Sequence, residues 1–173
     1  MITSKKIKLR AVEPSDIDLL FKWENDPKIW HLSNTLIPFS RFDLEQYVLN
    51  ASKDPFSAKQ VRFMIELSET ANTIGSIDLF DFEPIHHRAG IGILISDQDR
   101  NKGFATEAID LIMVYASKTL NLHQLYCNIE ENNQISLALF EKKNFKKIGL
   151  KREWNLRNGE WINEYLLQYV FKD

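Results

Sequence analysis

The stretch best suited to chemistry runs from Gly90 to Glu107, where an apolar segment passes through a polar, glycine-containing turn into the start of a helix. The first backbone N–H groups of a helix have no partner inside it, and the helix dipole favours negative charge at that end. Arg100 and Lys102 add positive charge, and Gly103 lets a ligand approach the main chain without meeting a Cβ atom. These residue types and their order predict a phosphate-binding turn.

Two familiar phosphate motifs do not fit this turn. A P-loop needs Gly-x-x-x-x-Gly-Lys-Ser/Thr, and Gly90-Ile91-Gly92 lacks the third glycine of a dinucleotide fingerprint. The spacing Arg100-x-x-Gly103-x-Ala105 is also short enough to occur by chance in an ordinary connection. Its surroundings favour the phosphate interpretation, because the apolar run Ile91–Ile95 precedes the turn and an amphipathic helix follows it.

Length and composition indicate what kind of protein contains this turn. The chain has 173 residues, of which 44% are hydrophobic, which is enough for the core of one domain, so we expect a single domain over 1–173. The net charge of -2 predicts neither a nucleic acid nor a membrane as partner, and no apolar run is long enough for a bilayer span. The N-terminal residues contain no apolar signal segment, which predicts a cytoplasmic protein. The lone Cys127, in an apolar run, predicts a buried thiol rather than a nucleophile.

Apolar periodicity divides the chain into strands and helices. Strands are expected at 6–12, 61–67, 73–82, 88–95, 123–129, 145–154 and 161–171. Helices are expected to begin near Pro14, Ser40, Gly103 and Asn133. The pair Asn158-Gly159 predicts a two-residue hairpin turn between the last two strands. The pattern predicts an α+β domain that contains an antiparallel meander.

In the order of these elements and in its motifs, the chain resembles the GNAT N-acetyltransferases, over nearly its whole length. It looks most like the branch that holds the ribosomal-protein N-terminal acetyltransferases and the spermidine N-acetyltransferases. The segments that carry the resemblance are Leu9–Asp16, Ile85–Ala89, Ile93–Ser96, Arg100–Glu107, Asn121-Leu122 with Leu125-Tyr126, and Glu131–Phe145. The resemblance implies the GNAT fold, a central, mixed and mostly antiparallel sheet of seven strands flanked by about four helices, and acetyl-CoA as co-substrate.

The resemblance also implies where acetyl-CoA binds. In such enzymes the strand equivalent to Ile91–Ile95 splays from the strand equivalent to Leu125–Ile129, and the pantetheine arm lies in the opening as a substitute strand. The implied contacts are the main chain of Ile93, Leu94 and Ile95 for the pantetheine amides, the turn Arg100, Asn101, Lys102, Gly103, Phe104, Ala105 and Thr106 for the pyrophosphate, Asn133 and Ser136 for the pantetheine arm, and Lys143 for the nucleotide phosphate. Helix capping explains Asn133 and Ser136 equally well, and Lys143 also fits a cation at a helix C-terminus.

Acetyl transfer to an amine needs a base for the amine and stabilisation of the tetrahedral oxyanion. Asp78 falls at the strand position where polyamine-acetylating relatives carry a glutamate, so it is the leading base candidate, ahead of Asp81 and Glu83. Alternation leaves a second interpretation open, in which the Asp78 side chain simply faces solvent. The oxyanion donor implied by the resemblance is a backbone N–H near Leu94 or Ile95.

The departing thiolate needs a proton, and here the chain departs from the family pattern. Many members carry a tyrosine on the short helix where this chain has Phe140, which has no proton to give. In that case Ser136, Tyr126 or a water supplies the proton, and Phe140 packs against the pantetheine. The departure also motivates an alternative function, a catalytically weak or inactive CoA-binding or protein-interaction module.

The predicted activity is transfer of an acetyl group from acetyl-CoA to a primary amine by direct attack in a ternary complex. The acceptor is a small-molecule amine, a polyamine or a protein N-terminus. Polyamine acetyltransferases of this branch carry several acidic residues in the early helical connection, whereas Trp30–Pro38 has none. The wider connection 29–39 is rich in aromatic and apolar residues, so it either lines a pocket or covers the core.

Metal binding and self-association are the remaining questions for the sequence. No metal is expected, because the adjacent pair His86-His87 would point to opposite faces of a strand and has no spaced partner. A homodimer through the aromatic C-terminal hairpin is possible, although alternate strand positions equally allow those rings to be buried internally.

Overall fold

The computed structural model describes residues 2–30, 35–51 and 54–172. The chain forms two compact units, one made of residues 1–10 with 55–173 and the other of residues 11–54. None of the helices in these described ranges is long and apolar enough to cross a bilayer.

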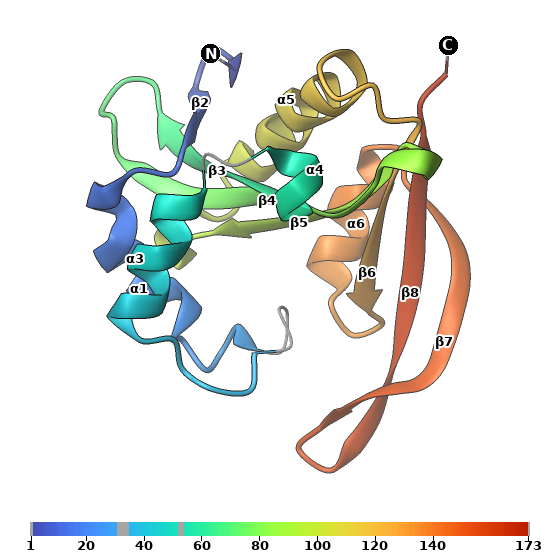
Figure 1. The fold of residues 1–173 in the computed structure, drawn as a ribbon. Coiled ribbons are helices and arrows are strands. Elements are labelled where there is room, and N and C mark those ends of the chain that lie inside the picture. The colour runs from blue at the N-terminus through green and yellow to red at the C-terminus, as the bar shows by residue number, and fades with distance from the viewer. Residues whose placement is uncertain (1, 31–34, 52–53, 173) are drawn as a thin grey trace. The chain divides into compact units, whose positions relative to one another are not determined.

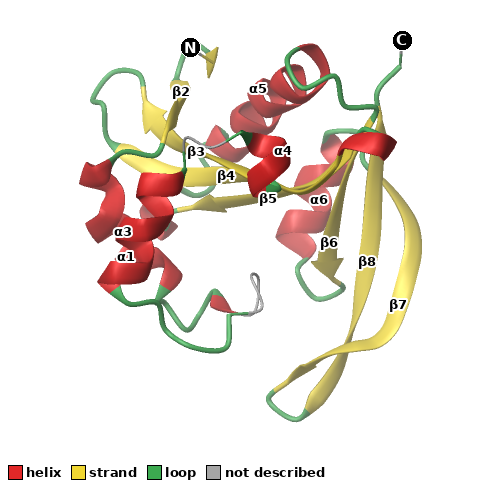
Figure 2. Ribbon diagram, viewed as in Figure 1, coloured by secondary structure: helices red, strands yellow, loops and turns green. Residues whose placement is uncertain are grey.

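The first unit is built on a sheet with the strand order β1-β2-β3-β4-β5-β6-β8-β7, so the described residues contain eight strands (Figure 2). The strands are β1 Ile2–Thr3, β2 Ile7–Ala11, β3 Gln60–Leu67, β4 Thr73–Glu83, β5 Arg88–Ile95, β6 Gln124–Glu130, β7 Lys146–Arg157 and β8 Glu160–Val170. All pairings for which a register is recorded are antiparallel except that of β5 with β6, which is parallel. The mixed, mostly antiparallel sheet and the seven predicted strands are confirmed. The eighth, β1, was missed because two residues are too few to show alternation.

The helices of this unit are α4 Pro55–Ala58, α5 Phe104–Lys118 and α6 Gln134–Lys142, with short 3-10 turns η2 Pro84–His86 and η3 Asp97–Asp99. Both predicted helix starts, near Gly103 and Asn133, are confirmed. The α5 helix places its buried side chains about one turn apart, so they form a single apolar stripe, made of Ala108, Ile109, Ile112 and Ala116.

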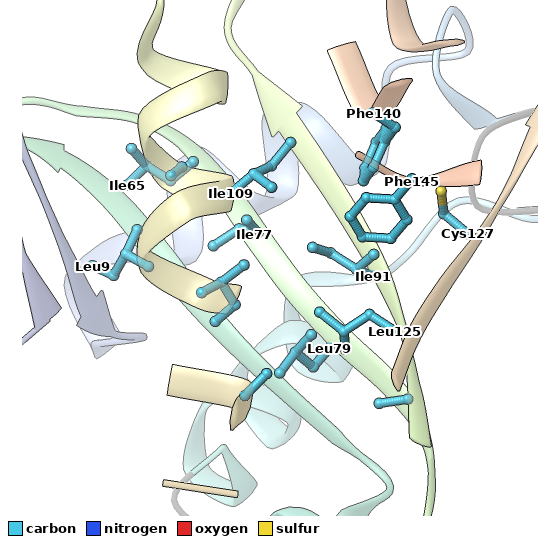
Figure 3. Close-up of a cluster of buried hydrophobic side chains, with 14 of the residues drawn as sticks. Leu9, Ile65, Ile77, Leu79, Ile91, Ile109, Leu125, Cys127, Phe140 and Phe145 are labelled. Carbon is cyan, nitrogen blue, oxygen red and sulfur yellow. The ribbon is translucent and has the colours of Figure 1, made fainter. Parts of the chain in front are cut away.

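The core of the first unit lies between the sheet and the helices α5 and α6. Alternate residues of the central strands, such as Ile77, Ile91 and Leu125, belong to one buried cluster with Ile109 of α5 and Phe140 of α6 (Figure 3). Since side chains alternate along a strand, residues between these buried positions face the other side of the sheet. Cys127 belongs to the same cluster and is 3% exposed, and burial raises the pKa of its thiol. The prediction of a buried thiol is confirmed.

The β7 and β8 strands run side by side as a long hairpin (Figure 1). Asn158 and Gly159 form its turn with φ of 50° and 85°, as a turn of this type requires. Trp154 and Trp161 are 58% and 61% exposed, whereas Tyr169 packs on the core. The hairpin aromatic residues therefore divide between surface and interior, and a homodimer through the two exposed tryptophans stays a prediction.

The second unit contains η1 Pro14–Asp16, α1 Ile17–Glu24 and α3 Arg41–Asn50. Ser40 and Asp43 form the N-terminal capping box of α3, in which the Ser40 hydroxyl accepts the Asp43 N–H at 3.1 Å and the Asp43 carboxylate accepts the Ser40 N–H at 3.1 Å. In the connection 29–39, residues 31–34 lie outside the described residues. Among the others, Leu36 and Ile37 are 89% and 75% exposed, so these two side chains do not cover the core.

Candidate active site

The β5 and β6 strands are paired only where they begin. Residues Arg88–Gly90 align with Gln124–Tyr126, and the recorded register goes no further. Both strands continue, β5 to Ile95 and β6 to Glu130, so their facing edges diverge beyond Gly90 (Figure 1). The predicted splay is therefore a feature of this sheet.

The register on the other side of β5 shows which main-chain groups lie on the open edge. The Ser96 N–H donates to the Ile74 carbonyl of β4 at 2.8 Å, and main-chain groups alternate in direction along a strand. The main chain of Leu94 therefore also faces β4, and that of Ile93 and Ile95 faces the open edge. The main chain of Ile93 and Ile95 is thus free to face a pantetheine arm, whereas the N–H and C=O of Leu94 point toward β4, and the three predicted contacts stay predictions.

One acceptor on this edge is already occupied. Arg100 donates its Nε–H to the Ile95 carbonyl at 3.1 Å. Within the described part of the chain, the N–H and C=O of Ile93 and the N–H of Ile95 have no partner on β6, because the pairing ends at Gly90, so they can bind a ligand that lies along the edge. With the N–H of Leu94 directed at β4, the N–H groups of Ile93 and Ile95 are the main-chain donors that this part of the open edge offers to an oxyanion.

The turn after β5 brings the predicted pyrophosphate residues to one end of α5. The helix begins at Phe104, with Gly103 at its N-cap in a left-handed conformation, φ 86°, and Asn101 also has positive φ, 63°. Glycine supplies no capping side chain, so the first N–H groups of the helix, from Phe104 to Thr106, point outward without an intrahelical partner. A Cβ atom added to Gly103 would meet none of the described atoms within 4 Å. An anion therefore has both donors and room at this helix end.

The cations of the turn are held by neighbouring carboxylates. Arg100 pairs with Asp97 at 2.9 Å, and Lys102 pairs with Asp99 at 2.9 Å. The hydrogen bond from Lys102, followed by one from Ser96, lowers the pKa of the Asp99 carboxyl below its usual range. Arg100 and Lys102 thus stay at the turn, with half of each side chain exposed, 50% and 52%.

On α6, the capping interpretation of Asn133 is confirmed. Its side-chain oxygen accepts the Ser136 N–H at 3.2 Å, as an N-cap residue does. Lys143, just after the helix, donates to both carboxylate oxygens of Asp110 on α5, at 2.6 Å each. The roles of Asn133, Ser136 and Lys143 toward acetyl-CoA stay predictions, and the ion pair of Lys143 with Asp110 was not visible in the sequence.

Phe140 and Tyr126 lie on opposite faces of the sheet. Phe140 is 4% exposed and packs edge-on against Phe145, with ring centroids 5.1 Å apart. Tyr126 alternates with the buried Leu125 and Cys127, so its ring lies on the face away from α5, edge-on to Phe80 at 6.4 Å. Burial, and to a smaller extent the nearby acidic side chains of β4, raise the pKa of Tyr126. The phenol therefore keeps its proton near neutral pH.

Asp78 also faces away from α5, because its neighbours Ile77 and Leu79 are buried in the core. Its cross-strand neighbours are Arg62 on β3 and Gly92 on β5. The Arg62 guanidinium contacts both carboxylate oxygens, at 2.6 and 3.3 Å, and the Asp78 side chain is 16% exposed. The carboxylate is thus fixed in an ion pair rather than free in solvent. Sequence reasoning missed Arg62, because only the register of β3 and β4 places it opposite Asp78.

Together these features suit an extended ligand with an anionic end. Its anionic group would lie at the start of α5, beyond Ile95, and its chain would follow the open edge of β5 back toward Gly90. At about 3.3 Å per residue, this edge from Ile91 to Ile95 is roughly 16 Å long. The far end of the ligand then lies where the strands converge, near Gly92, Asp78 and Tyr126. This arrangement suits a protein that holds a long, phosphate-bearing carrier along the edge of a strand.

The chain belongs to the GNAT acetyltransferase family, because the model of the acetyltransferase (GNAT) domain matches residues 6–146. Among known proteins, it is 26% identical over 171 residues to the uncharacterized N-acetyltransferase p20 of Bacillus licheniformis, covering 98% of this chain and 96% of that protein. It is 28% identical over 171 residues to the spermidine N(1)-acetyltransferase of Vibrio cholerae, covering 95% of each chain.

The fold is similar to solved structures of the same group. The crystal structure of the Vibrio cholerae spermidine N-acetyltransferase in complex with CoA and spermine superposes with a TM-score of 0.85 at 25% identity, covering 96% of each chain. The family, these relatives and the fold agree on one activity. The protein is an N-acetyltransferase that uses acetyl-CoA as co-substrate and acetylates an amine.

Proposed function

We propose that the acceptor is a primary amine that reaches the thioester on the face of the sheet opposite α5, with Asp78 as the general base. The observation that carries this proposal is the position of Asp78 directly across from Gly92, two residues beyond the last pair of β5 with β6. Gly92 has no side chain, so an acceptor on this face can approach the thioester end of the proposed ligand.

The environment of Asp78 suits a base. An alkyl amine is mostly protonated near neutrality, and a carboxylate is ionised there. A carboxylate has about four lone-pair positions, so the Asp78 oxygens that hold Arg62 can still accept a proton from an ammonium or a bridging water. The two-point contact with Arg62 fixes the direction of those lone pairs.

For the thiolate, we propose Tyr126 or Ser136 as the source of the proton, directly or through water. Tyr126 lies on the same face as Asp78, beside the last paired position of β5 and β6. Phe140 keeps a packing role, in agreement with its burial against Phe145. A thiolate is also a tolerable leaving group, so a weak donor is sufficient.

For the acceptor itself, polyamines come first. The relatives named above include the spermidine acetyltransferase of Vibrio cholerae, and its structure holds spermine. On this chain, Asp78, Asp81 and Glu83 place three carboxylates on one segment of β4, although Asp78 pairs with Arg62 and Glu83 pairs with Arg88. Trp30–Pro38 contributes none, so we propose a shorter amine or a protein N-terminus as the next acceptors to test.

The test is a screen of CoA thiol release over spermidine, spermine, short mono- and diamines and a peptide with a free N-terminus. With the best acceptor, Asp78→Asn should lower kcat by about 100-fold or more at pH below the pKa of the amine, in the range usual for a general base. Asp78→Glu keeps a carboxylate and should retain much of the rate. Asp81→Asn removes an exposed carboxylate from the same strand, so it controls for the loss of charge, and its pH–rate profile should stay that of the parent protein. An unchanged pH–rate profile in Asp78→Asn would remove Asp78 from the mechanism.

A further inference from the structure

The turn that precedes α5 contains a buried carboxylate, that of Asp99, which is not among the predicted cofactor contacts. Asp99 is 8% exposed, although it lies in a polar turn between two half-exposed cations. A carboxylate close to a diphosphate would repel it, so this acidic residue calls for a reason of its own.

The contacts of Asp99 supply that reason. One carboxylate oxygen accepts the Ser96 hydroxyl at 2.7 Å, and the other accepts the Lys102 ammonium at 2.9 Å. The Asp99 main-chain N–H also donates to the Ser96 carbonyl at 2.9 Å. Asp99 therefore links the last residue before the turn to the residue just before Gly103.

This link encloses the strained part of the turn. Between Asp99 and the start of α5, Asn101 has φ of 63° and Gly103 has φ of 86°. A non-glycine residue in the left-handed region carries a cost and persists when its surroundings fix it. The bond from Lys102 to Asp99 spans Asn101, so it holds closed the bend that brings the first N–H groups of α5 toward the end of β5.

We propose that Asp99 is a positioning residue for acetyl-CoA, which fixes Lys102 and the bend at Asn101 so that the diphosphate meets preformed donors. The inference rests on the proposed cofactor site at Arg100–Thr106 and is independent of the base and of the identity of the amine. Preorganised donors bind more tightly than mobile ones, because the ordering cost is met before the ligand arrives.

The sign of the effect separates this role from simple electrostatics. Asp99→Asn and Asp97→Asn each remove one negative charge from the same turn. Coulomb interactions alone would tighten binding of the diphosphate in both variants. Positioning by Asp99 predicts the opposite for Asp99→Asn, about a 10-fold weaker Kd for CoA. Asp97 is 75% exposed, and Arg100 keeps its bond to the Ile95 carbonyl without the Asp97 carboxylate, so Asp97→Asn should leave the Kd unchanged or slightly lower it.

The experiment is titration calorimetry of CoA with both variants and the parent protein, together with kinetics on acetyl-CoA and on S-acetylpantetheine, which has no diphosphate. For Asp99→Asn we expect a higher Kd for CoA and a higher KM for acetyl-CoA, an unchanged kcat, and unchanged kcat/KM with S-acetylpantetheine. Ser96→Ala, which removes only the hydroxyl bond to Asp99, should show the same pattern to a smaller extent and covers the case in which Asp99→Asn does not fold.

An unchanged or lower Kd for CoA in both Asp99→Asn and Ser96→Ala would overturn the proposal, and so would an equal loss with acetyl-CoA and with S-acetylpantetheine. Calorimetry keeps this result separate from the proposed chemistry. A protein that binds CoA but acetylates no amine would contradict the proposed function and leave the positioning role of Asp99 intact.

Discussion

The most direct test of the cofactor site uses two glycines with nearly the same positive φ angle. Gly103 at the start of α5 has φ of 86°, and Gly159 in the β7–β8 turn has φ of 85°. A Cβ added at either position would meet no described atom within 4 Å. Alanine therefore introduces the same backbone strain at both positions and no internal clash at either.

The expected loss of stability is equal for the two variants. A left-handed conformation costs a residue with a Cβ about 1–2 kcal/mol. For a chain of this size, each kcal/mol lowers the melting temperature by roughly 2–4 °C. Thermal unfolding of Gly103→Ala and Gly159→Ala should therefore show similar decreases.

The two variants should differ in their binding of CoA. At the proposed diphosphate site, a methyl group on residue 103 would occupy the space through which a phosphate oxygen approaches the first N–H groups of α5. Loss of one charge-assisted hydrogen bond costs about 1.5–3 kcal/mol, which corresponds to a roughly 10- to 100-fold weaker Kd. Gly159→Ala should bind CoA as the parent protein does. Equal CoA affinities in the two variants, measured by calorimetry well below the melting temperature, would refute a diphosphate site at this helix end.

Three further outcomes follow from contacts in the first unit. Lys143→Met should weaken CoA binding several-fold in calorimetry, whereas Asp110→Asn, which frees the Lys143 ammonium, should not; equal losses would mean that the pair only joins α5 to α6. Gly90→Ala should cost about 1–3 kcal/mol in denaturant unfolding, because its Cβ would lie 2.3 Å from the Phe80 ring, and Phe80→Leu in the same chain should recover part of that loss; no loss would show that the ring moves freely. Since hydrogen bonds lower the pKa of Asp99 below its ordinary 3.8, its ionised form stabilises the fold fully above about pH 5, and this stabilisation is lost as the pH falls through the folded-state pKa. The difference in unfolding free energy between the parent and Asp99→Asn should thus be constant above about pH 5 and shrink on acidification, and a constant difference down to pH 2 would contradict the assignment.

Local patterns in the sequence were sufficient for most elements of the fold. Apolar patterns over five or more residues predicted seven strands. Ser40, Gly103 and Asn133 predicted three helix starts, and Gly159 predicted the final turn. These signals depend on neighbouring residues, which is why they can be read from one chain. The pair Ile2–Thr3 is too short to carry such a signal, and its strand exists because β2 offers an edge to pair with.

The missing parts of the site are contacts between residues far apart in the chain. Arg62 lies opposite Asp78 because of the register of β3 and β4, and Asp110 meets Lys143 because α5 and α6 pack on one face. Neither follows from spacing. Unlike these two contacts, the direction of the Leu94 main chain could have been predicted from the sequence. Main-chain groups alternate as side chains do, so three consecutive residues cannot all face one edge.

That alternation links the core, the cofactor edge and the acceptor face within one strand. Along Gly90–Ile95, the residues whose side chains are buried toward α5, Ile91 and Ile95 with the partly buried Ile93, are also those whose main chain faces the open edge. The intervening glycines present almost no bulk to the opposite face, where the Phe80 ring lies against Gly90 and Asp78 lies across from Gly92. A shift of β5 by one residue would exchange all three properties at once, since it would expose the isoleucines and turn the wrong main-chain groups to the ligand. The packing of α5 on β5 therefore sets the register on which the cofactor and acceptor sites depend.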